Sequence, residues 1–331
     1  MRVGVLIPTR GAVMQSSRRP PVEEGWAMAR HADEHGYDAV WVGDSVVAKP
    51  RLEPLTTLAY VAAMTTRVRL GTAVLLPALR QPVVLAHQIA NVDQLSRGRS
   101  VLGLGVGWSL PSAELEWAAC GADHKRRARR LEEHIEIWRM LWRGAPVTHR
   151  GTGFELTDHT IGPLPWREAG PPLLITAGNR GEIIPAQFER FARLAQSGDG
   201  IITTYLDDKE CRVVRERAEE ALARQGRALP GFPLCVYTTV RMDRDRARAE
   251  REATEFLAVY YGGGVHTRGL MGLGPAEAVI GALRRYADAG VTDLCIRFVG
   301  DGQLAQLERF TEEVLPALGA TAPGPGAKER S

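Results

Sequence analysis

Lysine is scarce in this chain: only four of its 331 residues are lysines, and the other 38 of its 42 basic residues are arginines. An enzyme that forms a covalent imine needs a desolvated lysine, which we would expect at the end of a strand. None of the four directly follows a predicted strand: Lys49, Lys125, Lys209 and Lys328. The sequence therefore argues against aldolase-type lyases, and it leaves anion contacts as a natural use for some of the arginines.

Cysteine is also rare. The four cysteines lie far apart, so the sequence has no C-x-x-C pair and no zinc-finger spacing: Cys120, Cys211, Cys235 and Cys295. A disulfide framework is not expected in a chain this long with so few cysteines. We expect small, mostly buried thiols and no metal site.

Long hydrophobic runs and a strong excess of one charge are both absent. No apolar run reaches about 18 residues, and the N-terminal MRVGVLIPTR meets Pro8 too early for a signal segment. The formal net charge is +3, without the basic surplus that is typical of nucleic-acid-binding proteins. The sequence predicts a cytoplasmic protein that has neither a nucleic acid nor a membrane as its partner.

What the sequence does have is a regular alternation of short apolar runs and longer amphipathic stretches. Eight runs are predicted strands, at residues 3–7, 38–43, 68–76, 100–106, 172–176, 199–204, 232–240 and 292–299. Helices are predicted at 22–36, 53–66, 82–98, 125–143, 181–196, 207–225, 243–260, 275–289 and 301–317. Continuous apolar strands indicate a parallel sheet covered on both faces. Eight βα units favour a closed (β/α)8 TIM barrel over an open doubly wound sheet.

We expect one α/β domain over residues 1–318, with insertions on the C-terminal face of the barrel. The insertions are predicted at about 144–171, as a hairpin and loop, and at 261–274, which is rich in glycine. The second is either a lid over the barrel mouth or a disordered loop. The tail 319–331 is rich in Ala, Pro and Gly and is predicted to be disordered.

Three local motifs each have a plain structural explanation. His31–His35 has the H-x-x-E-H spacing of some zinc proteases, but it lies on a predicted outer helix. Gly103–Gly107 is G-x-G-x-G at a fourth strand, whereas the dinucleotide fingerprint is G-x-G-x-x-G after a first strand. The basic run 125–130 is either the solvated start of a helix or a contact for an anionic group. We expect no zinc site and no Rossmann site.

In a barrel of this kind, the chemistry is expected at the carboxyl ends of the strands. These positions are 9–10, 44–45, 73–77, 105–108, 177–180, 203–205, 241 and 297–301. One of them lies in the stretch ITAGNRG (175–181), which ends a strand and opens a helix. Backbone N–H groups and the helix dipole favour an anion there, and Arg180 would add a bidentate contact. The sequence therefore predicts a phosphate site, with a plain tight turn as the alternative.

Residues 68–108 contain the most specific pattern, VRLGTAVLLPALRQPVVLAHQIANVDQLSRGRSVLGLGVGW. This segment resembles the luciferase-like monooxygenase superfamily, whose pattern there is roughly LGT-x-V-x-x-P-x-x-R-x-P, A-x-L-D-x-L-S-G-G-R and LG-x-G-x-GW. The segments GYDAVWVGD (36–44), AQSGDGI (195–201), 289–292 and 314–318 are similar to further family segments. The resemblance covers about residues 1–318.

The resemblance implies an eight-stranded α/β barrel with the deazaflavin coenzyme F420, or reduced FMN, at its mouth. The sequence of residues 70–82 and 98–108 is closer to the F420-using oxidoreductases than to the alkanesulfonate or luciferase branches of the family. It also implies a non-prolyl cis peptide at Ala73-Val74 beneath the coenzyme ring, and a homodimer or larger assembly. Family contacts to the phosphate correspond to Ala177, Gly178, Asn179 and Arg180, and contacts to the ring and ribityl chain to Gly105, Gly107 and Thr203.

Two positions depart from the family. Its sugar-phosphate dehydrogenases have Asp-His after strand two and Glu after the glycines, where this sequence has Asp44-Ser45 and Trp108. Alcohol oxidation is therefore less expected than reduction of an activated double bond, since a hydroxyl is a poor general base. We expect Asp44, Ser45 and His266 to be catalytic, and Trp108 and Tyr205 to line the substrate pocket.

The predicted function is hydride transfer between coenzyme F420 and a small organic substrate. Two alternatives stay open at this point. One is an FMN-dependent two-component monooxygenase, and the other is a barrel that binds a coenzyme without turnover. A separate flavin or F420 reductase is the expected protein partner. The loops 45–53, 109–124, 144–171 and 261–274 would form the substrate pocket, but they contain no recognisable ligand motif.

Overall fold

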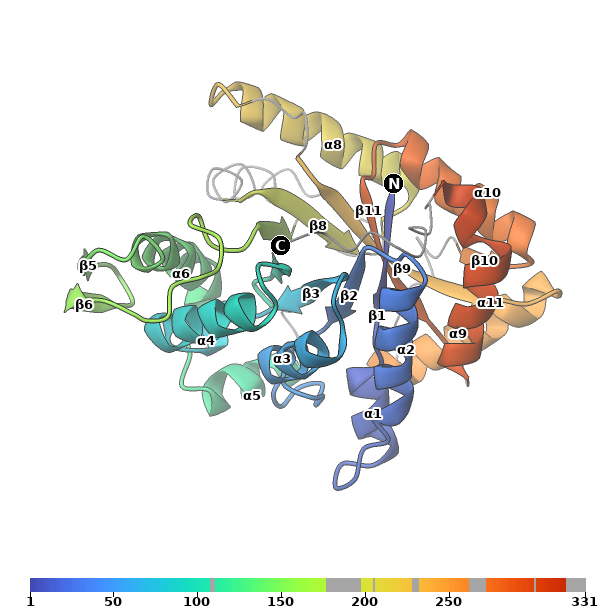
Figure 1. Cartoon of the computed structure of the whole chain (residues 1–331), viewed down its shortest axis with the longest axis horizontal. Helices are drawn as coiled ribbons and strands as arrows, with labels where there is room; N and C mark the ends of the chain where they lie inside the picture. The colour runs from blue at the N-terminus through green and yellow to red at the C-terminus, as the bar shows by residue number, and fades with distance from the viewer. Residues whose placement is uncertain are drawn as a thin grey trace, which may run out of the picture.

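Eight parallel strands close on themselves in the computed structural model of this chain (Figure 1). The structure describes residues 1–107, 111–176, 198–204, 206–227, 232–261, 272–300 and 302–319. The order around the barrel is β1-β2-β3-β4-β7-β8-β9-β11, and the pairing of β11 with β1 closes the barrel. The strands are β1 (Arg2–Leu6), β2 (Ala39–Val42), β3 (Arg69–Leu75), β4 (Ser100–Leu104), β7 (Leu173–Thr176), β8 (Gly200–Thr204), β9 (Leu234–Met242) and β11 (Asp293–Phe298).

Helices cover the outside of the barrel (Figure 1). They are α2 (Glu23–Glu34), α3 (Pro54–Met64), α4 (Pro82–Leu95), α6 (Arg127–Leu141), α8 (Asp208–Ala223), α9 (Arg246–Tyr261), α10 (Ala276–Asp288) and α11 (Gln303–Glu313). The predicted helix at 181–196 lies outside the described residues. All eight predicted strands are present, so the (β/α)8 barrel is confirmed and the open sheet is wrong. Strands such as β4 are buried at every position, which explains their unbroken apolar sequence.

The interior of the barrel is a packed core. Its inward-facing cluster includes Trp41, which is fully buried, together with residues from β1, β4, β7, β8, β9 and β11. A Cβ atom added to Gly4 or to Gly71, on the two strands that flank β2, would collide with the Trp41 indole. These two glycines therefore make the space that the ring occupies. Side chains fill the barrel below its mouth, and a ligand is expected at the mouth.

Two α-helices and one strand in the described part of the chain were not predicted. The helices α1 (Thr9–Gln15) and α5 (Pro111–Ala119) lie in regions expected to be loops, and both stand at the lower edge of Figure 1. The strand β10 (Gly272–Gly274) pairs in parallel with the end of β9. The expectation of a loop over 261–274 is therefore wrong at residues 272–274, because pairing with a distant strand orders a segment whose own sequence has no strand signal. Residues 262–271 lie outside the described part of the chain.

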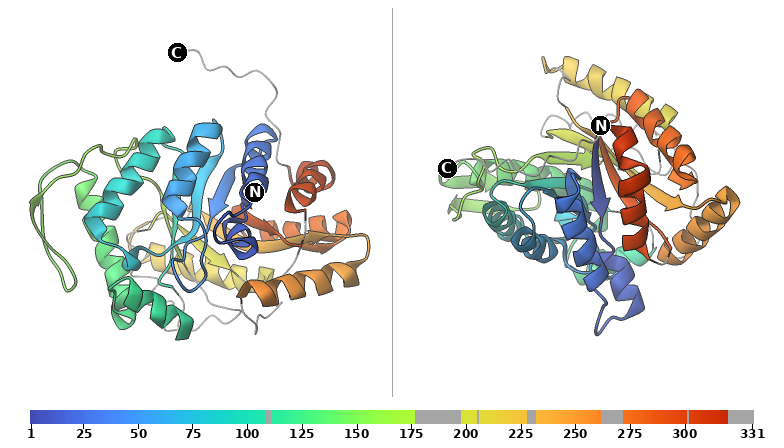
Figure 2. Two further views of the ribbon diagram at one scale, coloured as in Figure 1. Left: turned by 90° about the horizontal axis from the view of Figure 1, so that it is seen from below. Right: turned by 45° about the vertical axis from the view of Figure 1, so that its right-hand side comes forward.

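The insertion predicted at 144–171 is a hairpin of β5 (Val147–Arg150) and β6 (Glu155–His159), as expected. It stands out from the side of the barrel that α6 covers (Figure 2). The buried carboxylate of Glu133 on α6 holds it, because Glu133 accepts hydrogen bonds from the backbone N–H groups of Gly153 and Phe154 and contacts His149 Nε2 at 3.0 Å.

Several expectations about the rest of the chain can be compared with the structure. All four cysteines are free thiols, three of them buried, as predicted. The His31 ring stacks on the His35 ring, and its Nε2 atom lies 2.8 Å from the Thr311 hydroxyl. Within the described ranges, no three potential metal ligands gather, and no helix has the length and apolarity to cross a bilayer. Residues 320–331 of the predicted tail lie outside these ranges.

Candidate active site

The carboxyl end of β3 forms the floor of the barrel mouth. Ala73-Val74 is a cis peptide bond between non-proline residues, as the resemblance implied, and the β3–β4 register shifts around it. Gly105, directly after β4, donates its backbone N–H to the Leu75 carbonyl at 2.9 Å. A Cβ atom on Gly105 would lie 2.5 Å from Val74 Cγ2. The structure therefore brings three predicted coenzyme residues, Ala73, Val74 and Gly105, together as the floor of the mouth.

The wall beside this floor is α5. Gly107 has φ +73°, a conformation that favours glycine. A Cβ atom there would lie 2.9 Å from the ring of Trp117, which α5 contributes and which is buried. Trp117 packs with the turn after β3, including Leu76 and Leu79. The predicted coenzyme residue Gly107 thus lets the chain pass close to α5.

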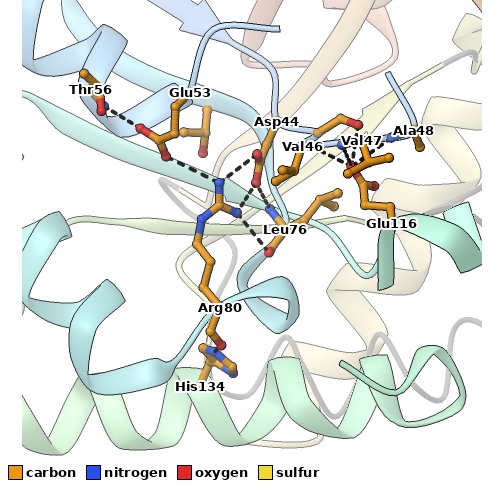
Figure 3. Close-up of polar contacts among 12 residues, drawn as sticks. Asp44, Val46, Val47, Ala48, Glu53, Thr56, Leu76, Arg80, Glu116 and His134 are labelled. Carbon is orange, nitrogen blue, oxygen red and sulfur yellow. Dashed lines mark hydrogen bonds and ion pairs between the residues drawn. The ribbon is translucent and has the colours of Figure 1, made fainter. Parts of the chain in front are cut away.

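Asp44, a predicted catalytic residue, is held by an ion pair with Arg80 (Figure 3). Arg80 Nη1 lies 2.6 Å from Asp44 Oδ2, and Arg80 Nη2 lies 3.0 Å from Asp44 Oδ1. Asp44 Oδ2 also accepts the backbone N–H of Leu76 at 2.9 Å. The Asp44 side chain is 1% exposed and that of Arg80 is 17% exposed. Both carboxylate oxygens of Asp44 are therefore occupied by donors that hold the end of β2 against the end of β3.

Arg80 connects this pair to the helical layer (Figure 3). Burial lowers the pKa of Arg80, but hydrogen bonds to Asp44 and the charges of Asp44 and Glu53 offset that effect and raise it. The Arg80 carbonyl oxygen lies 3.0 Å from His134 Nε2, and His134 Nδ1 lies 2.6 Å from the Arg130 carbonyl oxygen. Burial lowers the pKa of His134 to about 4, although both carbonyl contacts oppose this. A neutral ring can donate to only one of the two carbonyls.

Ser45, the second predicted catalytic residue, directly precedes residues 46–48, whose backbone contacts Glu116 (Figure 3). Glu116 Oε1 accepts the Ser45 hydroxyl at 2.7 Å and the backbone N–H groups of residues 46, 47 and 48 at 2.6, 2.8 and 3.2 Å. The Ser45 oxygen in turn accepts the N–H of Lys49 at 2.8 Å. Glu116 is 3% exposed, so a buried carboxylate on α5 sets the shape of the loop after β2.

Thr203, a predicted coenzyme contact, lies on β8. Its neighbour Ile202 belongs to the inward cluster of the barrel, whereas Ile201 packs with the outer core. Strand alternation therefore points Thr203 outward and Thr204 inward. Thr203 is buried, and its hydroxyl has no hydrogen-bond partner among the described residues. Thr204 Oγ1 donates to the Tyr237 carbonyl at 3.4 Å.

The remaining predicted site residues lie outside the described part of the chain. They are Trp108, Ala177, Gly178, Asn179, Arg180, Tyr205 and His266. Two site residues were missed at the sequence level, Arg80 and Glu116. Arg80 had a signal, because it is the arginine of the R-x-P family pattern. Glu116 had none, since α5 itself was not predicted.

The chain is similar in sequence to a known enzyme family. Residues 1–271 match the family model of the luciferase-like monooxygenases. The chain is 31% identical over 331 residues to an F420-dependent glucose-6-phosphate dehydrogenase of Amycolatopsis mediterranei, covering 88% of this chain and 93% of that protein. It is 26% identical over 262 residues to a 5,10-methylenetetrahydromethanopterin reductase of Archaeoglobus fulgidus, covering 79% of this chain and 73% of that protein.

Solved structures share the fold. The monooxygenase RslO1 from Streptomyces bottropensis superposes with a TM-score of 0.80 at 23% identity, covering 96% of this chain and 100% of that one. An F420-dependent secondary alcohol dehydrogenase, in complex with an F420-acetone adduct, superposes with a TM-score of 0.78 at 18% identity, covering 96% and 98%. At sequence identities this low, the similarity supports only the shared barrel fold.

Proposed function

Because the chain belongs to the luciferase-like monooxygenase family, we propose that it is an oxidoreductase that uses coenzyme F420 to transfer a hydride to or from a small organic substrate. Curated relatives that cover almost the whole chain at about 30% identity, such as the glucose-6-phosphate dehydrogenases of Kineococcus radiotolerans and Amycolatopsis mediterranei, are F420-dependent enzymes. Their sugar substrate is not carried over, because two proton-transfer positions of that branch differ in this chain.

The close packing of Gly105 against Val74 at the barrel mouth is the observation that carries the proposal. A Cβ atom at Gly105 would lie 2.5 Å from Val74 Cγ2, so glycine is needed where the end of β4 meets the end of β3, at the positions that the resemblance assigns to the coenzyme ring. When bound, coenzyme F420 supplies or accepts a hydride. Ala73, Val74, Gly105 and Gly107 would lie beneath its ring. Its phosphate is proposed at the predicted sites Ala177, Gly178, Asn179 and Arg180. Thr203 is kept as a proposed contact through its backbone, because its side chain points out of the barrel.

Within this function, we favour reduction of an activated double bond over alcohol oxidation. Oxidation needs a base at the mouth. The Ser45 hydroxyl is committed to Glu116, and the Asp44 carboxylate to Arg80 and Leu76. These contacts suit both residues for positioning the loop after β2. Reduction places negative charge on a carbonyl oxygen, which cationic groups stabilise, and the buried guanidinium of Arg297 lies at the end of β11.

His266 stays the proposed proton donor, and Trp108 and Tyr205 are the proposed walls of the substrate pocket. We further propose that a separate F420 reductase recycles the coenzyme and that the chain forms a homodimer. Light scattering of the purified protein measures its assembly. A mass of one chain would refute the homodimer without bearing on the reaction.

The deciding experiment is an ultraviolet–visible titration of the purified protein with coenzyme F420 and with FMN. We expect micromolar binding of F420. The variant Gly105→Ala should raise the Kd roughly tenfold, about 1.4 kcal/mol. Gly281→Ala is the matched control, because a Cβ atom there meets nothing. Binding of neither coenzyme would refute the proposal. Tight FMN binding with oxygen uptake would instead identify a monooxygenase.

A further inference from the structure

Positive side chains gather around two tyrosine rings at the end of α9. The Arg10 guanidinium lies 5.0 Å from the centroid of the Tyr260 ring, and Arg297 lies 5.1 Å from the same centroid. The Lys49 ammonium lies 4.4 Å from the centroid of the Tyr261 ring, and Arg297 lies 5.3 Å from it. These cations come from the first turn of α1, from the end of β11 and from the loop after β2. They meet at the barrel mouth.

A fourth cation, Arg51, reaches the inner face of the mouth. Gly43 comes two residues after the inward-facing Trp41, so its missing side chain would point into the barrel. A Cβ atom on Gly43 would collide with Arg51 Nη1 and would lie 3.7 Å from the Ala73 carbonyl. The Arg51 guanidinium therefore takes the space above Gly43, next to the floor on which we place the coenzyme ring.

The charges of Arg10 and Arg51 are not balanced by a carboxylate among the described residues. None of the ion pairs found there includes either side chain. The buried acids nearby are engaged elsewhere, Asp44 with Arg80 and Glu116 with the backbone of the loop. Burial lowers the pKa of Arg10, and the positive charge of Arg51 lowers it further. A bound anion would relieve the repulsion between these two guanidinium groups.

The position of this cluster separates it from the proposed coenzyme phosphate. The phosphate site is predicted directly after β7. Around the ring of eight strands, β7 stands four places from β1, the strand that Arg10 follows, in either direction. The two anion sites would therefore lie across the mouth from each other, with the coenzyme ring between them.

We propose that Arg10 and Arg51 bind an anionic group of the substrate, a carboxylate or a phosphate. This inference rests on the proposed function, because it names the substrate class of the same site. Arginine suits the task, since its planar guanidinium can make two parallel hydrogen bonds to either group. An anionic group of the substrate would also balance the positive charges of these two arginines, which no carboxylate among the described residues does.

The first test measures anion binding without any coenzyme. Wild type and variants are titrated calorimetrically with inorganic phosphate and with succinate. We expect Arg10→Gln and Arg51→Gln each to weaken binding by roughly tenfold or more, since a hydrogen bond to a charged group is lost. Arg51→Lys keeps the charge and should bind better than Arg51→Gln. The control Arg67→Gln changes an exposed arginine on the loop before β3 and should bind like wild type. Equal binding by wild type and both glutamine variants would overturn the proposal.

Both glutamine variants should fold, because each substitution relieves repulsion between like charges, and this offsets the loss of the hydrogen bond that each arginine donates to a backbone carbonyl. We expect their melting temperatures to equal or exceed that of the wild type in the absence of anions. Phosphate should raise the Tm of the wild type and of Arg67→Gln, and raise that of the glutamine variants less. Equal stabilisation of all four proteins by phosphate would again count against the site.

A second arm distinguishes the substrate from the coenzyme as the source of the anion. Each protein is titrated with intact coenzyme F420 and with its deazaflavin-ribityl fragment, which has no phosphate tail. If the site serves the substrate, the glutamine variants bind both like wild type. Weaker binding of the intact coenzyme alone would assign Arg10 and Arg51 to the coenzyme tail and overturn the substrate assignment. If wild type binds no coenzyme while phosphate binding still depends on the two arginines, the proposed function fails and the anion site stands.

Discussion

Asp44 and Arg80 form a bidentate ion pair between the end of β2 and the turn after β3, with the two N–O distances at 2.6 and 3.0 Å. The same carboxylate accepts the Leu76 N–H, two positions after the cis peptide. Two strand ends that carry the floor of the mouth are thus held together by one charged contact. Since the pair is largely buried, its integrity should matter to the whole fold.

Breaking this pair should be costly. Asp44→Asn leaves the Arg80 charge buried without its partner, and we expect the free energy of unfolding to fall by about 3 kcal/mol. Arg80→Met should cost a similar amount, and the double variant should cost less than the sum of the two. Equilibrium unfolding in urea measures all three. The exposed pair Arg309–Glu313 is the control, and Arg309→Met should cost at most about 0.5 kcal/mol. Additive costs for the two single changes would contradict the coupling.

The carboxylate of Glu116 should control the order of the loop after β2. Glu116→Gln keeps an acceptor oxygen but removes the charge that four donors share, so we expect a loss of about 1–2 kcal/mol. The amide hydrogens of residues 46–48 should exchange faster with solvent, as hydrogen-exchange mass spectrometry would detect. Glu114→Gln, exposed on the same helix, should change neither quantity. Unchanged exchange at 46–48 in Glu116→Gln would refute this role.

A methyl group at Gly71 should destabilise the fold, because the barrel core has no room for it. In Gly71→Ala the new Cβ would collide with the Trp41 ring, and overpacking of this kind costs about 1–3 kcal/mol. Gly281→Ala should have the opposite sign, because Gly281 lies within α10 in open space, where alanine stabilises a helix by about 0.5–1 kcal/mol. Urea unfolding compares the two. If Gly71→Ala were as stable as wild type, the tight fit around Trp41 would be disproved.

His134 should make the fold sensitive to mild acid. Its pKa is lowered to about 4 in the folded chain, from an ordinary value of 6.5. Between these values the unfolded chain binds a proton that the folded chain does not, so stability falls as the pH falls from 6.5 toward 4. The full effect of this group is about 3 kcal/mol.

Urea unfolding at several pH values between 7 and 4 measures this effect. His134→Asn should lose less stability over that range than wild type does, whatever its stability at pH 7. His87→Asn, a change at an exposed position of α4, should keep the wild-type pH dependence. Identical pH dependence in wild type and His134→Asn would show that His134 is not the responsible group.

Periodicity along the chain was enough to predict the barrel. Strands that are apolar at every position, such as β4, must be covered on both faces, and eight of them alternating with amphipathic helices have few other arrangements. The resemblance of residues 68–108 to the family also implied the cis peptide at Ala73-Val74, and it is found there. A family pattern that is continuous in the sequence was enough for this feature.

The contacts that shape the mouth could not be predicted in this way. Asp44 and Arg80 are 36 positions apart, Ser45 and Glu116 are 71 apart, and Arg10 and Tyr260 are 250 apart. The carboxyl ends of distant strands converge on one rim only when the barrel closes, and that closure chooses which side chains meet. The strand β10 shows the same cause, because its three residues pair with β9 without any signal of their own. Local sequence patterns determine the helices and strands. Closure of the barrel determines which side chains from distant segments come together as a site.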